Sequence, residues 1–327
     1  MTKDAMTFKG RLIRTTLPLL LASVALPAVA AHNNNAYVLN DFGGSVTVVD
    51  TKTNTVAATV PVGKNPIGVA VRPDGRYVYV ANGSSDSVSV IDAQTNTIST
   101  TVPVGHAPAA VVFSPNGALA YVAIANDSAL TVIDTATNAV VTTVPVGSIP
   151  LALAINPSGT RIYTANAGDF SVSVVDTATL DVIATLPVDI SPAAIAIGPL
   201  GERVYVANYD TNLLTMIDTS SNTVVGTMAA PGGPDGVAVG ALGIPVYLTN
   251  DTDGTLTAVN PFTKRTIASV PTGDNPSGLA VDRGAGRVYV TNFSSNTVSV
   301  VNTLTNKVVA TVGTGRGPIA VALQPRW

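Results

Sequence analysis

The side chains that most often serve nucleophilic and metal chemistry are scarce in this sequence. It has no Cys, its two His residues are His32 and His106, and Glu202 is its sole Glu. A structural zinc site, an axial haem ligand pair and a Cys nucleophile all depend on His or Cys side chains, so the sequence supports none of them. The G-x-S-x-G turn of serine hydrolases is also missing. The sequence therefore predicts no catalytic residues, no metal and no cofactor.

Acidic side chains are commoner, and many of them recur at a fixed interval. One column with a step of 42 residues contains Asp50, Asp92, Asp134, Asp176, Asp218, Asn260 and Asn302. An Asp before a Thr-rich, Asn-rich stretch typically accepts backbone N–H groups in an Asx turn, so we interpret the column as structural. The segment Asp251-Thr252-Asp253-Gly254 resembles the start of a calcium loop but lacks the further ligands and the closing Glu.

Positions that differ between otherwise similar repeats are better candidates for binding. One such column, two residues before a recurring Pro, contains Lys64, His106, Ser148, Ile190, Gly232, Asp274 and Arg316. If the last repeat borders the first in a ring, Lys64, His106 and Arg316 lie on neighbouring repeats. Asp274 then lies beside Arg316. Such a cationic arc is suited to a small anion, such as a carboxylate, a phosphate or a sugar acid. The alternative is a solvated rim that binds nothing.

A second set of polar and aromatic residues follows the recurring Tyr-containing segments. This set contains Asp41, Phe42, Phe170, Tyr209, Asp251 and Phe293. Exposed aromatic rings beside Asp and Asn side chains are typical of surfaces that contact carbohydrate or peptide. The same rings could instead be buried between neighbouring repeats. We place both sets in the candidate ligand-binding site.

Three columns establish the repeat, since they stay in phase over seven copies with a step of 42 residues. The first is the Asp/Asn column given above. The second contains Tyr37, Tyr79, Tyr121, Tyr163, Tyr205, Tyr247 and Tyr289. The third contains Pro66, Pro108, Pro150, Pro192, Pro234, Pro276 and Pro318.

Each repeat contains four short segments with the character of β-strands. In the copy that starts at Pro66, these segments are residues 67–71, 77–81, 87–91 and 97–104. Alternation of small polar and apolar residues, as in the third segment, is the period-two pattern of a strand. Turn-forming residues such as Pro73-Asp74-Gly75 separate the segments. Four antiparallel strands in about 42 residues is the size of one propeller blade.

The repeats predict an all-β, seven-bladed β-propeller over residues 36–327. A blade with two apolar faces must be covered on both, and a ring of blades achieves this. Small residues near the start of the first strand, such as Gly68 and Ala110, would let the inner strands crowd around the axis. The repeat region begins with a second-type strand and ends with a first-type strand. The C-terminal inner strand should therefore pair with the three N-terminal strands and close the ring, which we expect to be a monomer.

The N-terminus follows a different plan. Residues 1–30 contain four basic residues, an apolar run from Leu17 to Leu26 and the small-x-small motif Ala28-Val29-Ala30, which predict a Sec-type signal peptide. A retained anchor is the alternative, although the run is shorter than the roughly 20 residues of a membrane span. Residues 31–35 would be a short disordered lead, no later segment would span a membrane, and the protein would be periplasmic or secreted.

Removal of residues 1–30 changes the charge balance of the chain. Lys plus Arg falls from 17 to 13 and Asp plus Glu from 20 to 19, which leaves a net charge of −6. Proteins that bind nucleic acid usually present a basic face. The composition therefore disfavours a nucleic-acid partner.

The motifs Tyr79-Val80-Ala81-Asn82 and Tyr289-Val290-Thr291-Asn292 resemble the repeat that names the YVTN family of β-propellers. The resemblance extends over the whole repeat region and implies a seven-bladed ring outside the cytoplasm, but no shared catalytic residues. We interpret the Asn of each motif as a turn former. The third repeat departs from the pattern with Ile124 in place of this Asn, and further departures gather between Met228 and Lys264.

Fold alone does not decide function in propellers, so three hypotheses remain open. The first is a non-catalytic extracytoplasmic binding or protein-interaction platform, which uses the loops at the channel mouth to bind a small anion, a glycan or a protein segment. The second is an Asp- and calcium-dependent enzyme that resembles a lactonase or a quinoprotein. The third is a single-stranded nucleic-acid binding protein, against which the negative charge argues.

Overall fold

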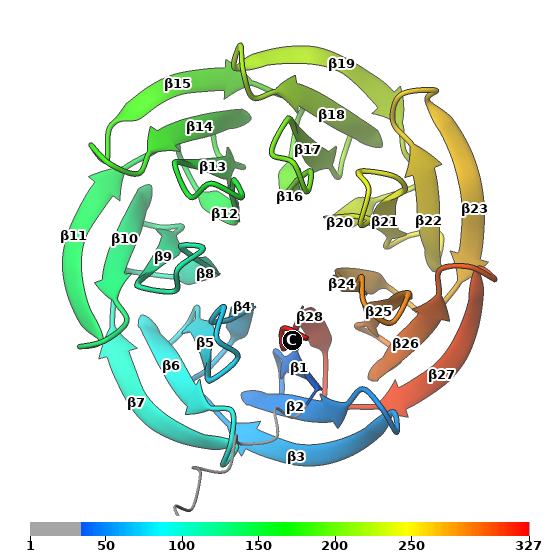
Figure 1. The fold of residues 1–327 in the computed structure, drawn as a ribbon, viewed down its shortest axis with the longest axis horizontal. Helices are drawn as coiled ribbons and strands as arrows, with labels where there is room; N and C mark the ends of the chain where they lie inside the picture. Colours follow the sequence, from blue (N-terminus) through cyan, green and yellow to red (C-terminus); the bar gives the residue numbers. More distant parts are fainter. Residues whose placement is uncertain (1–33, 327) are drawn as a thin grey trace, which may run out of the picture. The chain divides into compact units, whose positions relative to one another are not determined.

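The computed structural model describes residues 34–326, so the predicted signal peptide lies outside the described residues. Seven four-stranded antiparallel sheets stand in a ring (Figure 1), which confirms the predicted propeller. We number the blades along the chain: blade 1 contains β28, β1, β2 and β3, and blades 2 to 7 follow as β4–β7 through β24–β27. No helix in residues 34–326 is long and apolar enough to cross a membrane.

The strands keep the 42-residue step of the sequence. The innermost strands are β4 (Pro66–Val71), β8 (Pro108–Phe113), β12 (Pro150–Ile155), β16 (Pro192–Ile197), β20 (Pro234–Val239), β24 (Pro276–Asp282) and β28 (Pro318–Leu323). The second strands are β1 (Asn35–Asn40), β5 (Tyr77–Asn82), β9 (Leu119–Ile124), β13 (Arg161–Asn166), β17 (Arg203–Asn208), β21 (Val246–Asn250) and β25 (Arg287–Asn292).

The outer half of each blade is equally regular. The third strands are β2 (Ser45–Asp50), β6 (Ser87–Asp92), β10 (Ala129–Asp134), β14 (Ser171–Asp176), β18 (Leu213–Asp218), β22 (Thr255–Asn260) and β26 (Thr297–Asn302). The outermost strands are β3 (Thr55–Pro61), β7 (Thr97–Pro103), β11 (Ala139–Pro145), β15 (Val182–Pro187), β19 (Thr223–Ala229), β23 (Arg265–Pro271) and β27 (Lys307–Gly313).

The two ends of the chain close the ring as predicted. β28 pairs with β1, with Val38 opposite Val321 in the ladder. The Gln324 amide nitrogen donates to the Gly75 carbonyl oxygen of blade 2 at 2.6 Å. β1 begins at Asn35, one residue before the predicted start at 36, because Asn35 already lies opposite Asp50. All seven sheets lie within residues 35–323, so a chain that starts at His32 keeps every strand pairing.

The hydrophobic core lies between neighbouring blades rather than within one of them. In the cluster between blades 2 and 3, the Tyr79 ring meets the Phe113 ring edge-on, with centroids 4.9 Å apart. Equivalent clusters recur around the ring, and each combines residues of adjacent sheets. This arrangement explains why a single blade cannot be stable alone, since each of its faces needs a neighbour.

The inner strands crowd around the axis. A Cβ atom added at Gly68 would lie 2.5 Å from the Ala109 carbonyl oxygen of blade 3. A Cβ atom added at Gly278 would lie equally close, at 2.5 Å, to the Ile319 carbonyl oxygen. These distances are too short for real contacts, so the two positions require glycine for close approach of backbones.

The Asp/Asn column forms the Asx turns that the sequence predicts. The Asp92 carboxylate oxygen accepts the backbone N–H groups of Gln94 and Thr95 at 2.8 and 3.2 Å. Asn302, in the seventh copy, accepts those of Leu304 and Thr305 in the same way, both at 2.9 Å. The column is therefore structural.

The Asn of the YVTN-like motif does more than form a turn. Asn82 is buried, and its amide nitrogen donates to the Ser89 hydroxyl of the neighbouring strand at 2.9 Å. Its amide oxygen accepts the Gly63 N–H at 3.1 Å, which fixes the loop that enters the innermost strand. In blade 3 the exception Ile124 lies opposite Ala129, where blade 2 has Asn82 opposite Ser87, so this polar pair is replaced by an apolar one.

Candidate functional site

Two sets of loops meet at one end of the ring, which we call the mouth face. One set connects each outermost strand to the next innermost strand, and the other connects the second and third strands of a blade. In blade 2 the two sets touch, because the Ser84 N–H donates to the Lys64 carbonyl oxygen at 3.2 Å. The remaining loops lie at the other end, which we call the base face. The two predicted sets of site residues therefore share the mouth face.

The mouth face is acidic. Its Asp residues are Asp41, Asp86, Asp127, Asp169, Asp189, Asp210, Asp235, Asp251, Asp253 and Asp274. Lys64 and Arg316 are its only Lys or Arg residues within 34–326, so its net charge is −8 with His neutral. The base face has 11 Lys or Arg and 9 Asp or Glu residues. The predicted cationic arc thus stands in a negative field, which disfavours an anionic ligand.

The His106 side chain is engaged with an acidic neighbour. Its Nδ1 atom lies 3.0 Å from an Asp127 carboxylate oxygen, and Asp127 also accepts the His106 N–H at 2.9 Å. The hydrogen bond to Asp127, together with the charges of Asp127 and Asp86, raises the pKa of His106. Lys64 and Arg316 are exposed, and neither forms an ion pair with another described residue.

A pocket of about 410 Å³ opens in the mouth face over blades 5 to 7 and the innermost strand of blade 1. Its wall is formed by Tyr209, Asp235, Asp251, Asn275, Ser277, Phe293, Ser294 and Ile319. Three of the predicted site residues, Tyr209, Asp251 and Phe293, therefore come together here. We call this cavity the mouth pocket.

Tyr209 and Asp251 join blades 5 and 6 across the pocket. The Tyr209 hydroxyl donates to an Asp251 carboxylate oxygen at 2.6 Å. This hydrogen bond, with burial and with the charges of Asp251, Asp235 and Asp210, raises the pKa of Tyr209 to about 12. The hydroxyl therefore stays protonated at neutral pH and remains a hydrogen-bond donor to Asp251.

Asp235 is the charged pocket residue that the sequence analysis did not predict, and Asn275, Ser277, Ser294 and Ile319 were not predicted either. Its column, directly after the recurring Pro, contains Ile67, Ala109, Leu151, Ala193, Asp235, Ser277 and Ile319. The sequence does contain a signal for Asp235, since this column is apolar except for Asp235 and Ser277, which lie on adjacent blades. The Ser277 hydroxyl donates to the Asp235 carboxylate at 2.5 Å. Burial raises the pKa of Asp235, the Ser277 hydrogen bond opposes this, and the Asp251 charge adds to the rise.

The mouth pocket continues into the central channel. The channel cavity, also about 410 Å³, is lined by the innermost strands and shares Asp235, Ser277 and Ile319 with the mouth pocket. Its other lining residues are Gly, Ala, Val, Leu and Ile. Asp235 thus stands where a polar mouth meets an apolar channel.

The remaining predicted residues lie around the pocket or away from it. The Phe42 ring of blade 1 meets the Phe293 ring edge-on at 5.3 Å, so it extends one wall. Asp41 accepts a hydrogen bond from the Asn65 amide nitrogen at 2.6 Å and supports a neighbouring loop. Lys64, His106, Phe170, Asp274 and Arg316 do not line the pocket.

Within residues 34–326, no group of three or more His, Asp or Glu side chains could hold a metal ion. The mouth pocket instead offers two carboxylates, three hydroxyls, an amide and two aromatic rings. Such a set accepts hydrogen bonds from a cation or from several hydroxyl groups.

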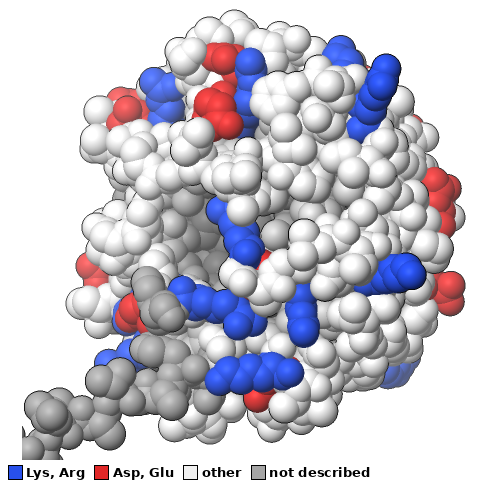
Figure 2. All heavy atoms as spheres, turned by 45° about the vertical axis from the view of Figure 1, so that its right-hand side comes forward, with Lys and Arg blue, Asp and Glu red and all other residues white. Residues whose placement is uncertain are grey.

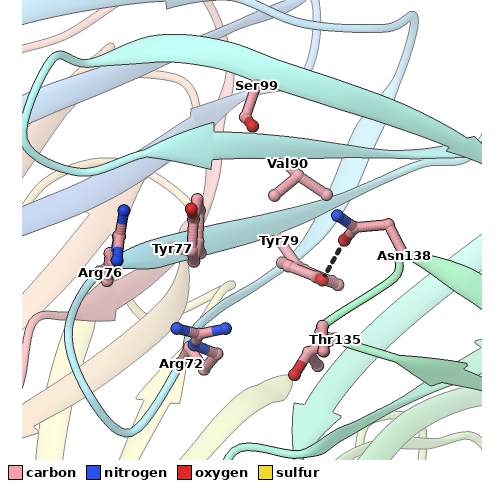
Figure 3. A pocket seen from close by; sticks show the side chains of 9 residues that line it. Arg72, Arg76, Tyr77, Tyr79, Val90, Ser99, Thr135 and Asn138 are labelled. Atoms are coloured by element: carbon pink, nitrogen blue, oxygen red, sulfur yellow. Dashed lines mark hydrogen bonds between the residues drawn. The ribbon is translucent and has the colours of Figure 1, made fainter.

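A second cavity, of about 240 Å³, lies on the base face between blades 2 and 3 (Figure 3). Arg72 stacks over the Tyr77 ring at 4.7 Å and pairs with Asp74, while the Tyr79 hydroxyl donates to Asn138 at 2.5 Å. At the equivalent place in blade 4, Arg161 donates to the Thr219 carbonyl oxygen of blade 5 at 2.7 Å. We therefore interpret this cavity as a joint between blades.

A ring of seven repeat-built sheets with a variable loop face defines the chain as a closed β-propeller repeat protein. Residues 6–167 match the family model of YNCE-like β-propellers. This match and the seven-bladed ring bear out the resemblance to YVTN-type β-propellers that the sequence shows. No curated protein matches the chain.

Solved structures share this fold at low sequence identity. Kuenenia stuttgartiensis hydrazine synthase is 22% identical with a TM-score of 0.74, and the match covers 80% of this chain and 90% of that chain. A protein of unknown function from Desulfotomaculum acetoxidans is 17% identical with a TM-score of 0.77, over 89% and 98% of the two chains. The dihydro-heme d1 dehydrogenase NirN is 16% identical with a TM-score of 0.67, over 89% and 66%. These likenesses concern the fold alone.

Proposed function

We propose that the protein is a monomeric, non-catalytic binding platform that acts outside the cytoplasm. Its mouth pocket would bind a ligand or protein segment that carries an amine or several hydroxyl groups. The observation that carries this proposal is Asp235, a carboxylate placed where the other inner strands, apart from that of Ser277, have an apolar residue.

The free-energy cost of burying a carboxylate supports a binding role for Asp235. Placing a carboxylate in a partly dry site is unfavourable unless hydrogen bonds or an opposite charge compensate for the lost water. Ser277 supplies one hydrogen bond, and the nearby Asp251 adds repulsion rather than relief. A bound ammonium or guanidinium group would supply the missing positive charge. The rings of Phe293 and Tyr209 could then contact the sugar or the aliphatic part of the same ligand.

Size and charge favour the same class of ligand. A pocket of about 410 Å³ falls within the usual range of small-molecule sites, roughly 300–1,000 Å³. The net charge of −8 on the mouth face would attract cations and repel anions. A glycan with amino groups or a Lys- or Arg-bearing protein segment therefore fits better than a small anion.

Asp235→Asn should weaken the binding of glucosamine or trilysine by roughly 10- to 100-fold, because a hydrogen bond to a charged group contributes about 1.5–3 kcal/mol. Calorimetric titration measures this, with succinate as the anionic probe. Since the pKa of folded Asp235 is raised, affinity should fall as pH is lowered through that pKa. The matched control is Asp189→Asn, which removes one mouth-face charge outside the pocket.

The thermal stability of the Asp235→Asn variant distinguishes a binding role of Asp235 from a structural one. A carboxyl whose folded pKa is raised contributes stability at acid pH that is lost as pH rises through the folded pKa. The Asp235→Asn variant has no carboxyl at this position and so does not lose stability as pH rises. Its melting temperature at pH 7 should therefore equal or exceed that of the wild type. Tighter binding of succinate than of trilysine, or unchanged trilysine binding by Asp235→Asn, would refute the proposal.

The location outside the cytoplasm rests on the sequence of residues 1–30, with its basic start, apolar run and Ala28-Val29-Ala30 motif. Cleavage near this motif should give an envelope or secreted protein that begins at Ala31 or His32. The intact mass of the protein from its native cells measures this. A mass that includes residues 1–30 would show that the leader is retained.

A further inference from the structure

Four large apolar side chains on the loops of the base face are more than half exposed. Leu200, Leu242 and Leu304 are 87%, 91% and 89% exposed, and Phe262 is 62% exposed. They lie on blades 5, 6 and 7, which are consecutive in the ring (Figure 1). We call these four residues the base prongs.

The base prongs break the repeat pattern. The column of Leu200 and Leu242 contains Asp74, Asn116 and Ser158 in blades 2 to 4 and Gly284 in blade 7. The column of Phe262 and Leu304 contains Lys52, Gln94, Ala136, Ala178 and Ser220 in blades 1 to 5. The turn geometry therefore does not require a large apolar side chain, and its occurrence on three adjacent blades calls for another cause.

Exposed apolar side chains on the outermost strands are different. Examples are Val141, Val225 and Val309, and residues of this kind occur in every blade. They belong to the strand pattern of the repeat, whereas the base prongs belong to one sector and one face.

Basic residues surround the prongs. On the base face of blades 5 to 7, the basic residues are Arg203, Lys264, Arg265, Arg283, Arg287 and Lys307. The acidic residues there are Glu202, Asp218 and Asp282. Asp218 is paired with Arg203 at 3.0 Å, and Asp282 is paired with Arg326 at 2.6 Å. Figure 2, which brings the side of blades 6 and 7 forward, shows Lys and Arg side chains spread over it and along the rim of the central hollow.

We propose that the base face of blades 5 to 7 docks on an anionic lipid surface. Separate apolar side chains on loop tips can each enter the boundary between lipid head groups and acyl chains, while Lys and Arg side chains contact the phosphates. A protein interface would more often require a contiguous patch or groove, and the prongs line none of the described cavities. Charge complementarity therefore selects a membrane rich in anionic lipid as the partner.

This arrangement determines the orientation of the ring on the membrane. The mouth face lies at the other end of the ring axis from the base face, so docking would present the mouth pocket away from the membrane. The inference does not depend on the function proposed for that pocket, since it uses none of the same residues.

Vesicle flotation tests the proposal with residues 32–327, which contain all seven sheets and lack the apolar run of the leader. The wild type should float with vesicles of phosphatidylglycerol and phosphatidylcholine, and much less with pure phosphatidylcholine. Combined Leu200→Ser, Leu242→Ser, Phe262→Ser and Leu304→Ser should reduce binding at least tenfold. The melting temperature should not change, because the four side chains are exposed.

Two further variants sharpen the result. Lys264→Gln with Arg265→Gln should weaken binding and reduce its dependence on salt, because fewer charges contact the phosphates. The matched control, Val141→Ser with Val225→Ser and Val309→Ser, removes exposed apolar area from the outer strands and should leave flotation intact. Absence of flotation with phosphatidylglycerol, or full flotation of the fourfold Ser variant, would overturn the proposal.

Discussion

A chain that ends at Gly317 should not form a stable ring. It lacks β28, so blade 1 keeps three strands, and its two neighbours, blades 7 and 2, each lose part of their cover. Burial of Val321 and partial burial of Ile319 and Leu323 contribute about 3–6 kcal/mol, which is a large share of the stability of a typical domain. Circular dichroism and chemical denaturation should show a loss of cooperative unfolding.

The matched control for this truncation ends at Gln324. It retains β28 and the hydrogen bond from Gln324 to Gly75 but loses Arg326 and its ion pair with Asp282. Its unfolding should stay cooperative, with a small decrease in melting temperature. If the chain that ends at Gly317 unfolded as cooperatively as the control, closure by β28 would not stabilise the ring.

Gly68→Ala should destabilise the ring by about 2–3 kcal/mol, because overpacking against a rigid neighbour is costly. The added methyl group would stand 2.5 Å from the Ala109 carbonyl oxygen and 2.7 Å from the Ala110 Cα atom. Both atoms belong to the backbone of β8, so no side-chain rotation relieves the clash. Urea denaturation with an unchanged m-value measures the loss.

Gly313→Ala is the matched control. No atom lies within 4 Å of a Cβ added at Gly313, which is at the end of an outermost strand. This substitution should be neutral or stabilise the fold by up to about 1 kcal/mol, because alanine restricts the unfolded chain. Equal effects at Gly68 and Gly313 would mean that close packing at the axis does not limit residue size.

Periodicity was sufficient to predict the fold. Tyr79 and its counterparts marked the second strands. Pro66 and its counterparts marked the innermost strands, which start at this Pro, one residue before the predicted start. The order of strand types at the two ends was enough to predict the pairing of β1 with β28. These features depend on local pattern and on counting, which a single sequence contains.

The requirement for glycine at position 68 could not be predicted from the sequence. Gly68 and Ala110 occupy the same column, and composition indicated only that the column is small. Which of its members must be glycine depends on how near the next inner strand comes, a distance that no local pattern encodes.

The candidate site was predicted in part, since Tyr209, Asp251 and Phe293 do line one pocket. Within one loop column, Lys64, His106 and Arg316 suggest a cationic site. The charge of the face depends on the sum over two sets of loops, and that sum is negative. Asp235 was missed because it lies inside a strand rather than in a loop.

Closure of blade 1 by β28 has a consequence for the timing of folding. Among the strands of residues 34–326, β1 leaves the ribosome first and β28 last, so blade 1 stays incomplete until the other six blades have been synthesised. Until then the nascent chain has an unfinished sheet and cannot gain the stability of the complete circle. A polypeptide that must be threaded through a translocation channel before it folds would benefit from this delay.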